Sequence, residues 1–230
     1  MLGVVPDPKT SPTEAPSGLR ADAERNRARI VDAAGRLYAT HGLGISMAAV
    51  ARAAGVGKAT LARHFATPQD LIDAVFVDRM ETYAAVTREA LEVADPWEAF
   101  VGYIWAVCRM QAEDRGFADL LTMTLPAAAQ LEELRETSYL GFLELITNAK
   151  ASGHLRPDFE SEDLIVLLMA NAGVVSAAAA EAPRAWERLV GQVLRGYASP
   201  EASTTVTMPP APSSEELVKA MARTIAPNRL

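Results

Sequence analysis

Helical periodicity, interrupted at regularly spaced prolines, is the feature that most limits how this chain can fold. Between the prolines, apolar residues recur three and four positions apart, as at Ile30, Ala34 and Leu37. No segment alternates apolar and polar residues between turn residues. Five prolines stand 26 to 31 residues apart and can each lie near the start of a helix: Pro68, Pro96, Pro126, Pro157 and Pro183. We therefore predict an all-α fold of about nine or ten helices.

The two ends of the chain differ in composition from the middle. Eight of the 14 prolines lie in the stretches 1–17 and 199–212, which are also rich in Ser, Thr and Ala. This composition predicts a disordered leader at 1–20 and a flexible tail at 199–230, with a possible short helix at 214–224. No basic segment followed by an apolar run opens the chain, so we expect no signal peptide.

A long apolar segment and a single cysteine bear on where the protein works. The stretch Leu164–Ala180 has no charge in 17 residues, fewer than the about 20 that cross a bilayer. It also contains Asn171, so we interpret it as a buried helix of a soluble protein and expect no membrane partner. Cys108 has no second cysteine to pair with in the chain. We expect a cytoplasmic protein.

Charge is distributed unevenly along the chain. The protein carries a net charge of −7, but residues 20–65 hold eight Lys or Arg and three acids, a local charge of +5. Residues 66–230 hold 13 basic and 24 acidic residues, a charge of −11. A small basic segment in an acidic protein indicates that one end binds a polyanion.

Residues 46–65 have the pattern of a helix-turn-helix motif, within a predicted domain at 21–83. Ala51 is small, as the crossing point of two helices requires, and Gly55 follows four residues later at the turn, where a positive φ is needed. The outward positions of the second helix are small, basic or hydroxylic, which suits a major groove. The alternative is an ordinary helical hairpin with a glycine turn.

The same region resembles the N-terminal domain of the tetracycline-repressor (TetR) family of transcriptional regulators. The resemblance rests on residues 29–38, Ser46-Met47, 55–61, 63–65 and Asp70-Leu71, and covers about 60 residues. It implies that a dimer binds a palindromic DNA operator through this domain. It also implies that the C-terminal domain forms the dimer interface and holds a pocket for a small-molecule inducer.

The resemblance also implies roles for single residues. Ser46 is expected at a phosphate, and His64 as well. Lys58, Ala59 and Thr60 are expected to open the recognition helix and to face base edges or backbone, while Arg63 reaches a base or a phosphate.

Three positions depart from the family pattern, which often has Ser at Gly57, Tyr at Ala62 and a basic residue at Pro68. Gly57 is still counted with the DNA-binding residues. Arg20, Arg25 and Arg27, ahead of the first helix, are expected to compensate by reaching the minor groove or the backbone.

Residues 84–198 are predicted to form a larger helical domain for ligand binding and dimerisation. An inducer cavity needs apolar walls and a few polar groups. The candidates for it are Trp105, Met123, Tyr139, Phe142 and Asn171. Each of them could instead be plain core. Asn171 interrupts an apolar helix and needs a hydrogen-bond partner if it is buried.

Small residues spaced along Leu164–Ala180 favour close approach of another helix. We expect Gly173, Ala177, Trp186 and Val190 to lie at a four-helix dimer interface. No histidine pair has metal-ligand spacing and no phosphate-binding glycine loop is present, so no enzyme, metal or cofactor is expected. The alternative functions are an all-α ligand-binding protein or a helical adaptor that does not bind DNA.

Overall fold

The computed structural model describes residues 17–122 and 129–225, and every secondary-structure element within them is a helix, apart from one isolated β-bridge between Leu155 and Ala198. The N-terminal part contains α1 (Ser17–His41), α2 (Met47–Ala54) and α3 (Lys58–His64). The remaining elements are α4 (Pro68–Leu91), α5 (Pro96–Glu113), α6 (Arg115–Thr122), α7 (Ala129–Ala151), α8 (Ser161–Ala178), α9 (Ala185–Tyr197), the short 3-10 helix η1 (Ala202–Thr204) and α10 (Ser214–Ile225). The predicted all-α fold is confirmed.

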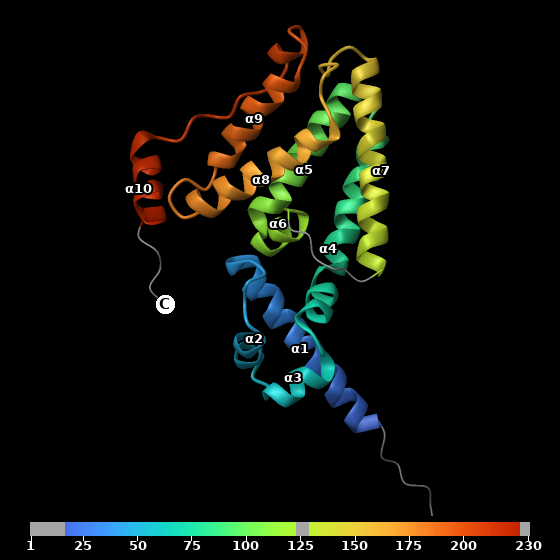
Figure 1. The fold of residues 1–230 in the computed structure, drawn as a ribbon, viewed down its shortest axis with the longest axis vertical. Coiled ribbons are helices and arrows are strands. Elements are labelled where there is room, and N and C mark those ends of the chain that lie inside the picture. The colour runs from blue at the N-terminus through green and yellow to red at the C-terminus, as the bar shows by residue number, and fades with distance from the viewer. Residues whose placement is uncertain (1–16, 123–128, 226–230) are drawn as a thin grey trace, which may run out of the picture.

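The helices form a small lower unit and a larger upper one. Figure 1 shows α1, α2 and α3 at one end of the molecule, with the long helix α4 rising from them into the bundle of α5 to α9. The C-terminal half of α1 reaches up to α6, so two elements join the units. A change in the upper helices can therefore reach the lower unit through α4 or through the contact of α1 with α6.

Two of the predicted proline sites begin helices with full capping. Thr67 accepts a hydrogen bond from the backbone N–H of Asp70, the Asp70 carboxylate accepts one from the N–H of Thr67, and Pro68 follows as the first helical residue. Asp95 caps α5 with its side chain, ahead of Pro96. These caps fix where α4 and α5 start.

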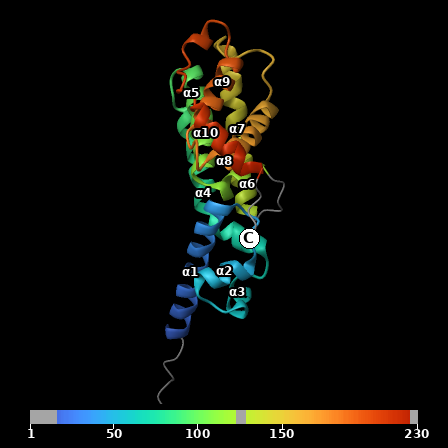
Figure 2. The same ribbon diagram turned by 90° about the vertical axis from the view of Figure 1, so that its left-hand side faces the viewer.

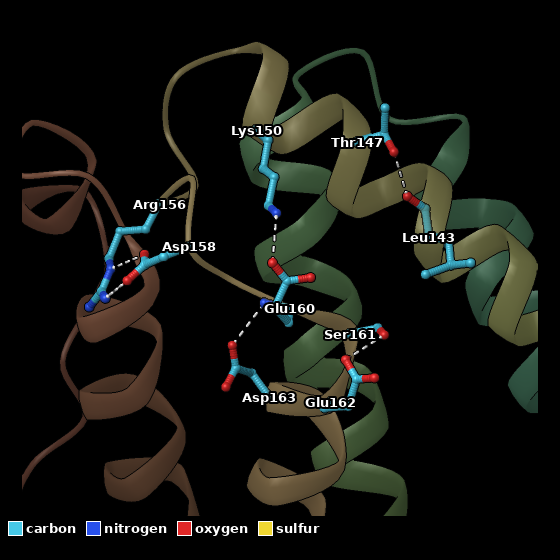
Figure 3. A network of polar contacts seen from close by, with 9 residues as sticks. All are labelled: Leu143, Thr147, Lys150, Arg156, Asp158, Glu160, Ser161, Glu162 and Asp163. Carbon is cyan, nitrogen blue, oxygen red and sulfur yellow. Dashed lines mark hydrogen bonds and ion pairs between the residues drawn. The ribbon is translucent and has the colours of Figure 1, made fainter.

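Polar contacts in the loop between α7 and α8 set the start of α8. Figure 3 shows Lys150 of α7 paired with Glu160, and the backbone N–H of Glu160 donating to the carboxylate of Asp163 at 2.9 Å. In the same loop, Arg156 pairs with Asp158. The first turn of α8 carries two acids, Glu162 and Asp163, where the helix dipole favours negative charge.

Helix α8 is buried on one side only within the subunit. It is the one helix in the described residues with the length and apolar composition of a membrane span, and a third of that window is buried. Its outward face exposes Ile165, Val166 and Met169. The prediction that Leu164–Ala180 is a buried helix therefore holds on one side only within a single chain.

The segment after α9 differs from the expected flexible tail. It runs back along α9, where Arg188 donates to the Pro209 carbonyl at 2.7 Å and Gly191 lies against Met208 and Pro209. It ends in α10, whose Ala220 packs on alanines at the α8–α9 turn. Figure 2 shows α10 in front of α8 on this side of the molecule. The segment packs because glycine and alanine on α8 and α9 leave room for it.

Candidate nucleic-acid interface

The turn between α2 and α3 has the geometry of a helix-turn-helix. Ser46 caps α2 by accepting a hydrogen bond from the N–H of Ala49 at 3.3 Å. Gly55 ends α2 with φ 63°, in the left-handed region that favours glycine. The N–H of Val56 donates to the carbonyl of Ala51 at 3.0 Å. The positive φ inferred for Gly55 is confirmed.

Buried side chains lock the two helices together. Val50, Ala51 and Ala54 of α2 are buried, as are Leu61 of α3 and Phe65 directly after it. The position of Ala51 at the crossing, with 2% of its surface exposed, agrees with the sequence analysis. The orientation of the seven-residue helix α3 is therefore set by the packing of these buried side chains.

The outward side of α3 presents the polar residues that the sequence analysis selected. Lys58, Ala59 and Arg63 are exposed, while Thr60 and His64 are half-buried. The Arg63 guanidinium donates to Thr60 Oγ1 at 3.3 Å, which couples these two side chains. Gly57 precedes the helix and offers no side-chain cap. One face thus carries two cations and a hydroxyl.

Two arginines of α1 contact the motif, Arg27 at its C-terminal end and Arg29 at its turn. The Arg27 guanidinium stands 5.4 Å from the ring centroid of Phe65, and Arg27 shares an open surface hollow with His64. Arg29 donates to the Ala54 carbonyl at 2.7 Å, at the C-terminal end of α2. This role of Arg29 could not be predicted from the sequence, because its partner is a backbone carbonyl 25 residues away.

The candidates for an inducer cavity that the structure describes contact different partners. Trp105 contacts Trp186 edge to face, with ring centroids 5.9 Å apart. Phe142 is buried and stacks on Tyr103 of α5. Tyr139 is 46% exposed and its hydroxyl lies 3.2 Å from Ser161 Oγ. Met123 lies outside the described residues. Trp105, Phe142 and Tyr139 thus pack against three different partners.

Asn171 is the buried polar member of that set, and its partner is Gln111 of α5. Its Nδ2 donates to the Gln111 Oε1 at 2.9 Å and to the Cys108 carbonyl at 3.1 Å. Asn171 Oδ1 and Gln111 Nε2 are buried without a hydrogen-bond partner. Each such atom costs about 1–3 kcal/mol. Gln111 was missed, although a glutamine after a long apolar helical run is a visible signal.

Helix α6 connects the lower unit to α8 through two further residues that the sequence analysis missed. Asp119 accepts a hydrogen bond from the N–H of Leu43, just after α1, at 2.8 Å. Arg115 donates to the Thr40 carbonyl at 3.4 Å and to Ser176 Oγ of α8 at 2.9 Å. Arg115 therefore touches both the end of α1 and the outer side of α8.

The four residues expected at a dimer interface divide into two pairs. Gly173 and Ala177 are both exposed on the outward face of α8. Trp186 is 8% exposed and Val190 is 0% exposed, so both face the interior of their own subunit. Val190 offers a partner no surface, and its place at the interface is corrected. Leu189 and Val193 of α9 are half-buried and leave some apolar surface exposed.

Both the N-terminal and the C-terminal unit match models of known protein families. Residues 30–75 match the family model for bacterial regulatory proteins of the tetR family. Residues 95–199 match the model for the C-terminal domain of SbtR-like transcriptional regulators. A search of curated proteins gave no match.

Among solved structures, a TetR transcription regulatory protein from Mycobacterium vanbaalenii is 31% identical. The alignment covers 79% of this chain and 99% of that one, with a TM-score of 0.46. RolR, solved with resorcinol, is 18% identical with a TM-score of 0.52, over 84% and 98% of the two chains. A gamma-butyrolactone receptor described as ArpA-like is 19% identical with a TM-score of 0.54, over 87% and 97%.

These matches agree with the geometry of α2 and α3, and they cover the N-terminal and the C-terminal unit alike. The two family models describe transcriptional regulators, so the chain is a regulator and not an enzyme. With 31% identity over nearly the whole of a TetR protein, and with both family models matched, this chain belongs to the TetR family of transcriptional regulators.

Proposed function

We propose that this protein is a dimeric transcriptional repressor of the cytoplasm that binds a palindromic operator through α3. The observation that carries the proposal is the outward side of α3, where Lys58, Thr60 and Arg63 project from a helix fixed by buried Leu61 and Phe65. A helix held in this way can enter a major groove and present these groups to base edges and phosphates. Ser46 and His64 stand at its margins, where phosphates would lie.

A second copy is needed because one seven-residue helix reads few base pairs. Two recognition helices about 34–36 Å apart meet successive major grooves on one side of DNA. The outward face of α8 supports pairing of two chains, since Val166, Met169, Gly173 and Ala177 are all exposed there. Leu189 and Val193 of α9, which are half-buried within the subunit, are proposed to join the same interface.

Release from DNA is proposed to follow binding of a small molecule in the C-terminal domain. Two unpartnered amide atoms between α5 and α8 support such a site. RolR, which shares the fold, was solved with resorcinol. A ligand that favours a different position of α8 would shift α6 through Arg115 and change the spacing of the two α3 helices.

The test is selection of DNA from a random pool with the purified full-length protein. We expect the selected sequences to converge on a palindrome whose half-sites lie about one helical turn apart. Affinity for that palindrome should fall steeply with salt and should be lost when one half-site is scrambled. A pool that does not converge, together with equal affinity for scrambled DNA, would favour a ligand-binding protein or an adaptor that does not bind DNA.

A further inference from the structure

The buried amides of Gln111 and Asn171 form an incomplete hydrogen-bonding pair between α5 and α8. Both residues are 0% exposed. Their neighbours one turn away on the same helix faces are apolar and buried, namely Val107, Cys108, Leu167, Leu168 and Val175. The two polar side chains are thus surrounded by apolar residues in the core of the C-terminal domain.

The orientation of the two amides follows from what they contact. Asn171 Nδ2 meets two acceptors, the Gln111 Oε1 and the Cys108 carbonyl, so both of its hydrogens are used. Turning the Asn171 amide would bring its oxygen against both of those oxygens. Turning the Gln111 amide would bring two NH₂ groups together. The atoms left over are therefore one acceptor, Asn171 Oδ1, and one donor, Gln111 Nε2.

We infer that Gln111 and Asn171 recognise a neutral group of the effector that both donates and accepts a hydrogen bond, such as a hydroxyl or a carboxamide. This inference rests on the proposed function, because it names the chemical class of the ligand that the C-terminal domain takes. The ligand group donates to Asn171 Oδ1 and accepts from Gln111 Nε2, which completes the pair.

The surroundings favour a neutral group over an anion. Burial raises the pKa of the Cys108 thiol, one helical turn from Gln111, to about 12. The same desolvation opposes a carboxylate or a phosphate beside the pair. The polar partners of Asn171 are a side-chain amide and a backbone carbonyl, neither of which carries a charge.

Access to the pair requires α5 and α8 to separate, because both residues are 0% exposed. Helix α8 packs against α5, α6, α9 and α10, while its outward face is exposed at Val166, Met169 and Gly173. Its link to α6 includes the hydrogen bond from Arg115 to Ser176 Oγ. A ligand seated at Gln111 and Asn171 would therefore act on the helix that carries this link.

The test uses four probes with the same ring and different substituents: phenol, benzamide, benzoate and toluene. Binding of each probe to the full-length protein is measured by calorimetry and ligand-observed NMR at millimolar concentration. We expect phenol and benzamide to bind, toluene to bind at least roughly tenfold more weakly, and benzoate not to bind. Failure of both phenol and benzamide to bind, or toluene binding as tightly as they do, would overturn the inference.

Variants locate the probe. Gln111→Leu and Asn171→Leu should each weaken phenol and benzamide roughly tenfold or more, since one hydrogen bond is removed from a buried site. Thr87→Val is the matched control, because it removes a buried hydroxyl whose bond goes to the Tyr83 carbonyl. Equal binding to all variants places the probe elsewhere and overturns the inference. A crystal structure with an ordered water on both amides, and no probe there, does the same.

Operator binding by the wild-type protein is measured separately. A protein that binds its palindrome but fails the probe test counts against this inference alone. A protein that binds the probes at the pair but selects no operator counts against the proposed repressor.

Discussion

Gly116 of α6 lies against Tyr38 of α1 so closely that a Cβ on the glycine would stand 2.8 Å from the Tyr38 Cβ. The same Cβ would lie 2.7 Å from Cζ of Phe76 in α4. Both aromatic rings are buried, and they stack on each other with centroids 6.0 Å apart. The absence of a side chain at Gly116 is what lets α6 meet α1 and α4 at one point.

Gly116→Ala should destabilise the fold by about 1–3 kcal/mol, because the Tyr38 backbone cannot move aside as a flexible side chain would. Urea unfolding followed by circular dichroism measures this. The control is Gly102→Ala in α5, which has nothing within 4 Å of its Cβ position and should stabilise the helix by about 0.5–1 kcal/mol. Equal stability of the two variants would show that α6 does not pack this tightly on α1.

The helix-turn-helix could be predicted from the sequence because its determinants are local. The cap at Ser46, the small residue at Ala51 and the left-handed turn at Gly55 lie within one short segment and act on one another directly. Their physical requirements leave few alternatives. The starts of α4 and α5 were predictable for the same reason, since a capping residue and a proline stand side by side.

Contacts between distant segments could not be predicted in this way. Arg29 can donate to the carbonyl at the end of α2, and Asp119 can accept from the N–H of Leu43, only after the helices have packed. The proposed interface on α9 is a related case. Its apolar residues cover more than one face, and periodicity does not say which face meets the same chain. The structure turns Val190 inward and leaves Leu189 half-buried, one residue away.

Ala51→Leu tests the crossing of α2 and α3. The larger side chain has no room at a position that is 2% exposed. We therefore expect destabilisation by about 1–3 kcal/mol and failure of operator binding, with the dimer retained. Ala53→Leu, on the exposed side of the same helix, should keep both stability and affinity. Thermal unfolding and a mobility-shift assay give the two measurements. Full affinity in Ala51→Leu would contradict the assigned packing.

Lys58→Ala tests the proposed DNA contact of α3. Removing one cation per subunit should weaken operator binding and flatten the plot of log affinity against log salt, by roughly one unit of slope for each phosphate that is no longer neutralised. Arg88→Ala removes an exposed cation from the last turn of α4, at the opposite end of that helix from α3, and serves as the control. An unchanged slope in Lys58→Ala would mean that this lysine does not contact DNA.

Ala177→Arg tests the proposed pairing of two chains through α8. Ala177 is exposed within the subunit, so an arginine there leaves the fold of one chain undisturbed. In a dimer joined through this face, the same arginine would place an unpaired charge in an apolar interface. Burying an unpaired charge raises the free energy of the dimer strongly. We expect sedimentation to report a monomer, circular dichroism to report unchanged helix content, and operator binding to fall sharply because two half-sites are no longer linked. Ala94→Arg, in the exposed connection between α4 and α5, should remain a dimer with full affinity. A full-affinity dimer in Ala177→Arg would place the interface on another face of the molecule.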